Sequence, residues 1–224
     1  MANETNESRF FHPSVTADVV ALKDLDIDRK SESITTKVLL IRRADSAKVF
    51  PGAWALPGGF MDESDESIAA AAVRELQEET GITPTKLRLL GTFTEKGRDP
   101  RGPVHSTAFL ATVSADAVPA AGDDASEAKW FDVEIRQKDD VKFGFHFKDA
   151  DGAGCMLIEA EEREDSYGME TYDIVKLYSA DGRFSLAFDH DRILVAGLMR
   201  LCTDLVIYAL TERDERQDQD KKED

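Results

Sequence analysis

The chain of 224 residues is long enough for one domain with a sizeable core. Its formal net charge of -17 repels a phosphate backbone, which argues against nucleic acid as a partner. The N-terminus has no secretion-signal pattern and the two cysteines form no CxxC pattern, so the protein is expected to be cytoplasmic. Its longest apolar run is broken by Arg200 and Asp204, so it is not expected to enter a membrane.

Five short segments among the first 133 residues carry the β-branched and apolar side chains that are typical of strands. They are separated by polar stretches in which glycine, proline and aspartate favour turns. The stretch 24–33 is expected to be a charged turn, and residues 1–11 a flexible polar arm. The predicted strands span residues 13–23, 35–43, 86–96, 104–113 and 128–133.

One helix is predicted in this region, and an ordered loop rich in proline and glycine, residues 51–59, leads into it. The helix is expected to run from Ser64 to Thr80, with Ser64 or Asp65 as its N-cap and Gly81 as its stop. Its apolar residues share one face and would pack on a core. Its acidic residues lie along the rim of that face.

The second half of the chain begins with hairpin signals. Residues 141–162 and 170–188 each contain two alternating runs joined by an Asp-Gly turn, which predicts two β-hairpins. A buried helix is expected over residues 189–210, with Asp189 as its N-cap, and the polar residues 211–224 predict a disordered acidic tail. Strands and helices mix without regular alternation, so the predicted fold class is α+β or a three-layer arrangement.

Three glutamates of the predicted first helix lie at positions where acidic side chains destabilise a helix. Glu75, Glu78 and Glu79 lie near the helix C-terminus, although like charges three or four residues apart cost roughly 0.2–0.5 kcal/mol per pair and the helix dipole also opposes them. Arg74 is expected to pair with only one, Glu78 at i+4. A solvated acidic face is the simplest interpretation of such a run. However, these carboxylates have too few protein partners and lie beside a Pro-Gly-Gly loop, which instead indicates a site for bound Mg²⁺. Such ions would support metal-assisted hydrolysis of a diphosphate.

A glycine, an acid and the pattern REL-x-EE-x-GI occur here at fixed spacing, as Gly59, Glu66 and residues 74–82. This set resembles the Nudix box, the signature of the Nudix hydrolases. The match departs in one place, because six residues instead of five separate Gly59 from Glu66. Either Asp65 or Glu66 could fill the acid position, and Glu66 keeps the spacing to Arg74.

Further segments extend the resemblance to the branch of ADP-ribose pyrophosphatases and Nudix-type regulators of NAD metabolism. The similarity covers most of residues 12–133 and resumes at 186–210, whereas residues 134–185 look like an insertion of β-hairpins. It implies a single domain over residues 12–210 with the α/β/α sandwich of the Nudix fold, in which a mixed sheet lies between helices. The segments that carry it are FHPSVTADVVALK, WALPGGF, LLGTF, GRDPRGPVHSTAFLA and LAFDHDRIL.

The resemblance also implies roles for the box. Arg74 orients one of the glutamates, and a backbone carbonyl of Gly58 or Gly59 completes a metal site. The expected ligands of Mg²⁺ or Mn²⁺ are Gly59, Glu75, Glu78 and Glu79, and the expected catalytic residues are Glu66, Arg74, Glu75, Glu78 and Glu79.

Substrate-binding residues are expected in the loop 97–103. Arg98, Asp99 and Arg101, with Gly58 of the box, are candidates for gripping phosphate or ribose, because arginine binds phosphate oxygens through paired hydrogen bonds. A solvated turn around Pro100 is the alternative.

The general base is left open between a box glutamate, Glu127 and the acids of residues 159–164. All four histidines are expected to be structural, with His190 near the first turn of the last helix.

The favoured function is metal-dependent hydrolysis of a nucleoside diphosphate linked to another group, best fitted by ADP-ribose giving AMP and ribose 5-phosphate. One alternative keeps hydrolysis but takes a nucleotide sugar, a dinucleoside polyphosphate or an oxidised nucleoside triphosphate. The less favoured alternative is a non-catalytic ADP-ribose sensor, since the box glutamates are complete and a DNA-binding domain is not expected in the short tail. The partners are then a small-molecule substrate and, in a homodimer, a second copy, with neither nucleic acid nor membrane.

Overall fold

The computed structural model describes residues 10–28, 30–31, 33–122, 125–150, 154–164, 170–179 and 184–205. Ten strands and one complete helix, α1 (Ile68–Thr80), have defined bounds within these residues. A second helix covers residues 190–205, up to the end of the described part. The strands are β1 (Ser14–Asp28), β2 (Ser33–Arg43), β3 (Trp54–Ala55), β4 (Gly58–Phe60), β5 (Lys86–Phe93), β6 (Val104–Thr112), β7 (Ala125–Gln137), β8 (Lys142–Lys148), β9 (Gly154–Glu164) and β10 (Glu170–Ser179).

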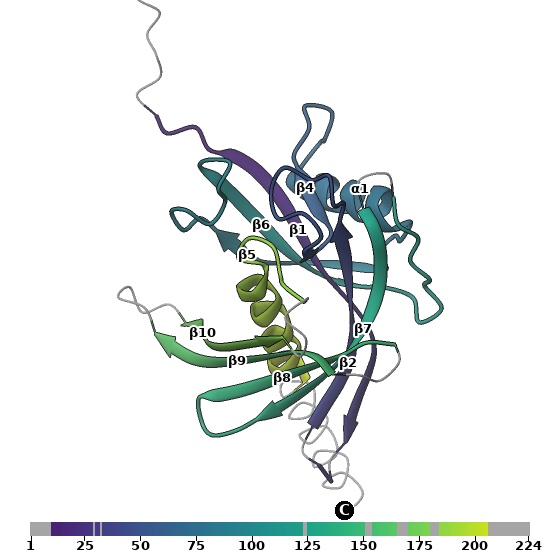
Figure 1. Cartoon of the computed structure of the whole chain (residues 1–224), viewed down its shortest axis with the longest axis vertical. Coiled ribbons are helices and arrows are strands. Elements are labelled where there is room, and N and C mark those ends of the chain that lie inside the picture. The colour runs from purple at the N-terminus through teal and green to yellow at the C-terminus, as the bar shows by residue number, and fades with distance from the viewer. Residues whose placement is uncertain are drawn as a thin grey trace, which may run out of the picture.

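One curled, mixed sheet organises these elements (Figure 1). Its strand order is β10-β9-β8-β7-β2-β1-β6-β5, and β3 and β4 pair with β2 and β1. Neighbours along this path run antiparallel except β1 and β6, which are parallel over nine residue pairs. The α+β class predicted from the sequence, with a mixed sheet between helices, is confirmed.

The central strands are buried on both faces, as the continuous apolar run of residues 35–43 predicts. On one face, α1 contributes the small side chains Ala71 and Ala72 with Leu76. These pack against Ala17, Val19, Leu39 and Phe109 of the sheet.

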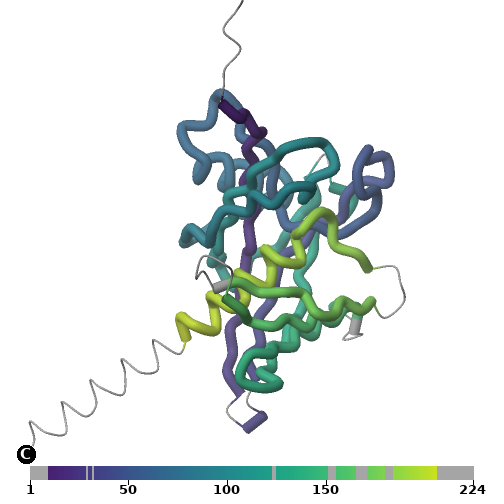
Figure 2. Tube along the Cα trace, turned by 90° about the vertical axis from the view of Figure 1, so that its left-hand side faces the viewer, coloured from purple at the N-terminus to yellow at the C-terminus, as the bar shows by residue number. Residues whose placement is uncertain are grey.

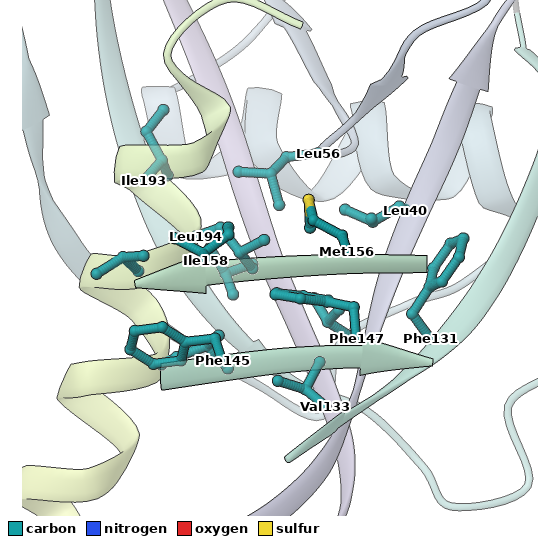
Figure 3. Close-up of a cluster of buried hydrophobic side chains, with 14 of the residues drawn as sticks. Leu40, Leu56, Phe131, Val133, Phe145, Phe147, Met156, Ile158, Ile193 and Leu194 are labelled. Atoms are coloured by element: carbon teal, nitrogen blue, oxygen red, sulfur yellow. The ribbon is translucent and has the colours of Figure 1, made fainter. Parts of the chain in front are cut away.

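The helix of residues 190–205 packs on the other face, within the curl of the sheet (Figures 1 and 2). Its residues Ile193, Leu194 and Leu198 are fully buried. They belong to one core with side chains of β7, β8 and β9, many of which Figure 3 shows, among them Phe131, Phe145 and Ile158. No helix in the described part of the chain is both long and apolar enough to span a membrane.

Three local predictions are wrong. The stretch 24–33 is not one charged turn, because β1 runs on to Asp28 and pairs with β2 through Asp26 and Ile27. The helix α1 begins after Ser67, whose hydroxyl accepts a hydrogen bond from the N–H of Ala70, and neither Ser64 nor Asp65 is the N-cap. The stop at Gly81 is confirmed, since this residue takes the left-handed conformation at φ 70°.

The third error concerns the hairpins. The β8–β9 pair confirms the first, but β10 pairs with β9 and not with residues 184–188. In that segment Leu186 makes an isolated parallel bridge with Trp54 instead. The Asp-Gly turns at 151–152 and 181–182, most of the N-terminal arm, residues 206–210 and the tail 211–224 lie outside the described residues.

Gly197 lets the helix of residues 190–205 approach β1. A Cβ added there would lie 2.9 Å from Cγ1 of Val20, whose branched side chain cannot easily turn away. We expect Gly197→Ala to lower the free energy of unfolding by about 1–2 kcal/mol, because overpacking outweighs the gain in helix propensity. Urea unfolding of Gly197→Ala, Val20→Ala and the double variant tests this. The double variant should lose less free energy of unfolding than the two single variants lose together, and strictly additive losses would contradict the contact.

Candidate active site

Arg74 lies at the centre of the acidic cluster on α1. Its Nε and Nη2 donate to Asp65 at 3.0 and 2.9 Å, its Nη1 donates to Glu75 and Glu78 at 2.8 and 3.0 Å, and Nη2 also donates to the Phe60 carbonyl at 3.1 Å. These bonds use all five donors of the guanidinium. The expectation that Arg74 pairs with only one acid is therefore wrong, and the pKa of Arg74 is raised, chiefly by Asp65.

The loop before α1 shows how the additional residue of the box is accommodated. Asp65, one position before the acid that keeps the family spacing, forms the paired bonds with Arg74 and also accepts from the N–H of Asp62 at 2.8 Å. Glu66 is exposed and lies at the rim of an open groove beside α1. The structure therefore brings Asp65, and not Glu66, to the arginine.

Glu79 is buried against the Pro-Gly-Gly turn. Its Oε2 accepts a hydrogen bond of 2.8 Å from the N–H of Gly58. Burial raises the pKa of Glu79 to about 8, although the hydrogen bond from Gly58 acts in the opposite direction. Repulsion from Glu75 and Asp18 adds to the rise. Glu79 is thus a desolvated acid with a fixed position.

Glu75 lies against the next glycine of the turn. A Cβ added at Gly59 would lie 2.5 Å from the carboxyl carbon of Glu75, so a larger residue there would displace the acid. Burial raises the pKa of Glu75 in spite of Arg74. The side chain of Glu78, by contrast, is 61% exposed and is the most accessible of the three.

The end of α1 is held from outside the helix. The N–H groups of Gly122 and Ala120 donate to the carbonyls of Glu79 and Thr80 at 2.9 and 3.0 Å, where a free helix end would leave these carbonyls without partners. This loop fixes the turn that carries two of the three glutamates.

A small cavity of about 50 Å³ opens beside Gly58 and Gly59. Both acidic and basic side chains line its walls. The charged and polar lining residues include Asp18, Arg43, Arg98, Asp99, Arg101 and His190.

The three expected substrate-binding residues all line this cavity, together with Gly58. Arg98 is buried and donates two hydrogen bonds to Asp189, at 2.9 and 2.6 Å. Asp99 is buried and holds Arg101, whose guanidinium lies over the ring of Phe60 at 4.6 Å. Because the side chains of Arg98 and Asp99 are buried, a solvated turn, the alternative considered above, does not describe these two residues. Of the three, Arg101 is the most exposed to an incoming ligand.

Sequence reasoning missed several lining residues. Asp18 is a buried acid inside the apolar run of β1, and that position was the available signal. No signal in the sequence pointed to Arg43 and Phe188, because only the tertiary fold brings the end of β2 beside the segment before the last helix. The other acids considered as a general base lie elsewhere: Glu127 pairs with Lys129 at 3.2 Å on β7, and residues 159–164 belong to β9.

The donors at the end of α1 suit a hard divalent cation. Carboxylates and glycine carbonyls are oxygen ligands of the kind that Mg²⁺ prefers, and a cation would relieve the mutual repulsion of the partly buried acids Glu75 and Glu79. Among the described residues no three acidic, histidine or cysteine side chains already converge as a cluster that could hold a metal ion. Arg74 draws Glu75 and Glu78 to itself, and Glu79 faces Gly58.

Comparison with known proteins decides the family. The sequence profile of the NUDIX domain matches residues 27–148, more than half of the chain. The chain belongs to the Nudix family. The resemblance stated from the sequence is thereby confirmed.

Two curated relatives illustrate the branch. The ADP-ribose pyrophosphatase of Methanocaldococcus jannaschii is 41% identical over 124 residues, which cover 55% of this chain and 64% of the relative. The ADPR responsive transcriptional repressor NtrR of Acinetobacter baylyi is 32% identical over 111 residues, which cover 49% of this chain and 44% of the relative. The match thus spans less than two thirds of the length of either relative.

Solved structures support the fold. A MutT/nudix family protein from Enterococcus faecalis superimposes with a TM-score of 0.61 at 28% identity, covering 88% of this chain and 64% of that one. The NUDIX domain of Shewanella oneidensis NrtR, solved in complex with ADP ribose, gives a TM-score of 0.53 at 24% identity, covering 86% of this chain and 90% of that one. At that identity the second likeness speaks for the fold alone.

Asp65 and Glu66 can be separated by their effect on stability. At pH 7 we expect Asp65→Asn to lower the melting temperature measurably, because Arg74 loses a charged acceptor, and Glu66→Gln to leave it unchanged within error. Hydrogen bonds from Arg74 lower the pKa of Asp65 from 3.8, so this stabilisation is present above the unfolded-state pKa and is lost as pH falls through the folded one. The difference in melting temperature between wild type and Asp65→Asn should therefore be constant well above pH 3.8 and shrink as pH falls below 3.8. Thermal unfolding followed by circular dichroism measures it, and equal effects of the two substitutions would contradict the assignment.

Proposed function

We propose that this protein is a metal-dependent Nudix hydrolase that cleaves the diphosphate bond of ADP-ribose to give AMP and ribose 5-phosphate. The observation that carries the proposal is the arrangement at the end of α1. There Arg74 gathers Glu75 and Glu78, and Gly58 holds the buried Glu79, beside a cavity lined by three arginines. The relative from Methanocaldococcus jannaschii, named an ADP-ribose pyrophosphatase, supports the choice of substrate.

Each residue of the box has a distinct part in this proposal. Bound Mg²⁺ or Mn²⁺, held by Glu75, Glu78, Glu79 and a carbonyl of Gly59, would neutralise the diphosphate and lower the pKa of a water. Arg74 orients Glu75 and Glu78, and Asp65, one of the two acids that the sequence left open for the acid position of the box, anchors the arginine. Glu78 has the freedom to approach a ligand because it is exposed.

The cavity, with a volume of about 50 Å³, would receive a phosphate group of the substrate. Arg101 can turn toward a phosphate because its side chain is partly exposed, whereas Arg98 and Asp99 shape the wall through their own ion pairs. We assign the general base to a box glutamate, because Glu79 contacts Gly58 in the wall of the cavity. Glu127 instead pairs with Lys129 on β7, and residues 159–164 belong to β9.

Two alternatives are kept. The NtrR relative is described as an ADPR-responsive repressor, which favours a non-catalytic sensor of the same ligand. The box itself recognises a diphosphate, so a nucleotide sugar, a dinucleoside polyphosphate or an oxidised nucleoside triphosphate would fit it equally well. The homodimer, the cytoplasmic location, the absence of nucleic-acid partners and the insertion at residues 134–185 stay predictions from the sequence.

A hydrolysis panel tests the substrate. With Mg²⁺ present we expect ADP-ribose to be cleaved with at least about a tenfold higher kcat/KM than NADH, nucleotide sugars, diadenosine polyphosphates or nucleoside triphosphates, a difference of about 1.4 kcal/mol in transition-state binding. The products should be AMP and ribose 5-phosphate, identified by chromatography and mass spectrometry, and EDTA should stop the reaction. Turnover of none of these compounds, with ADP-ribose bound, would favour the sensor.

The metal ligands are tested by a matched pair of substitutions. We expect Glu78→Gln to lower kcat/KM at least about 100-fold, or about 2.7 kcal/mol, because an amide is a much weaker ligand for Mg²⁺ than a carboxylate. Glu66→Gln should keep wild-type activity, since Arg74 gives its hydrogen bonds to other acceptors and Glu66 is exposed. Full activity of Glu78→Gln, in a protein with an unchanged melting temperature, would show that the ligand set is wrong.

A further inference from the structure

The turn that holds Glu79 is fixed by three consecutive residues. The N–H of Leu56 donates to Nδ1 of His190 at 2.9 Å, the carbonyl of Pro57 accepts from the N–H of Val19 at 2.9 Å, and the N–H of Gly58 donates to Glu79. Two of these partners are the box glutamate and the backbone of β1. The third, His190, lies 134 residues away in sequence from the residue that it contacts.

His190 stands where a short ladder of backbone hydrogen bonds is interrupted. Around the parallel bridge of Trp54 with Leu186, the N–H of Trp54 donates to the Ser185 carbonyl and the N–H of Ala187 donates to the Trp54 carbonyl, both at 2.8 Å. If the parallel pattern continued, the N–H of Leu56 would next donate to the carbonyl of Ala187.

That carbonyl is already in use. It accepts from the N–H of His190 at 3.2 Å as the last helix begins. Between the two residues, Phe188 takes the left-handed conformation at φ 56°, which turns the chain away from residues 54–56. The imidazole of His190 thus supplies the acceptor that the backbone no longer offers.

The environment of His190 suits this role. Leu56 is buried, so its N–H would be costly to leave without an acceptor. Burial lowers the pKa of His190, which favours the neutral ring. Because Nδ1 accepts from the N–H of Leu56, the proton of the neutral ring is assigned to Nε2. Nε2 faces Asp18 at 3.6 Å, and an added Cβ at Gly58 would lie 2.7 Å from Oδ1 of that same carboxylate.

We propose that His190 is a positioning residue for the candidate metal site: its Nδ1 ends the ladder in place of a backbone carbonyl and thereby sets the N–H of Gly58 that holds Glu79. The sequence indicated only a structural histidine here. The inference rests on the proposed function in one respect, the role of Glu79 as a metal ligand.

The test compares His190→Asn, His190→Gln and His190→Ala. Asparagine places an oxygen where Nδ1 lies, whereas glutamine places one near Nε2 and alanine places none. Leu198→Ala, in the core of the same helix, is the control for lost stability without lost positioning. Binding of Mn²⁺ alone is measured by electron paramagnetic resonance of the free ion, at a temperature at which each variant is folded.

We expect His190→Ala and His190→Gln to weaken Mn²⁺ binding at least about tenfold and His190→Asn and Leu198→Ala to stay within about threefold of wild type. Equal binding by His190→Asn and His190→Gln, or the same loss in Leu198→Ala, would overturn the positioning role. The comparison of asparagine with glutamine stands even if the alanine variant does not fold.

A second measurement separates this inference from the proposed function. Failure of the wild type to bind Mn²⁺ or Mg²⁺ would contradict the metal site and not the role of His190. Amide hydrogen exchange at Leu56 and Gly58 does not need a metal. It should be at least about tenfold faster in His190→Gln than in His190→Asn, and equal exchange rates would overturn the inference.

Discussion

The candidate site depends on one arginine side chain that several acidic side chains share. Arg74 gives every N–H of its guanidinium to an oxygen, and four of the five bonds go to carboxylates. This explains how a helix can end in a run of glutamates that repel one another and oppose the helix dipole. Arg74 offsets only part of the cost of burying these acids, because the pKa of Glu75 stays raised in spite of the arginine. The pKa of Glu79, which accepts from the N–H of Gly58, is raised as well.

Close approach of the backbone is the second constraint. Gly59 leaves room for the carboxyl group of Glu75, and Gly58 presents its N–H to Glu79. The turn is itself held at consecutive residues by β1 and by His190. Sheet, helix and C-terminal helix therefore meet at the same few atoms, so the geometry of the acids reflects packing across the whole domain.

The cavity beside this turn has a different character from the acidic cluster. Its arginines come from β2 and from the loop after β5, and most of their charge is balanced by buried aspartates. The paired aspartates allow positively charged arginines to lie in this cavity, in a protein whose net charge is -17. A buried pair costs desolvation, so these pairs are weak evidence for stability, and the ligand-binding role proposed for the cavity would account for them.

The sequence by itself determined the α+β class, the strands at the centre of the sheet, the end of α1 at Gly81 and the family, because these follow from local periodicity and from residues at fixed spacing. Only the tertiary structure decided that Asp65 and not Glu66 pairs with Arg74, since an additional residue in a loop is absorbed by the path of the chain. The same holds for His190 and Asp18, whose partners are distant in sequence. Spacing along a chain reports contacts within a helix turn, but contacts between a turn, a strand and a far helix are set by how the core packs.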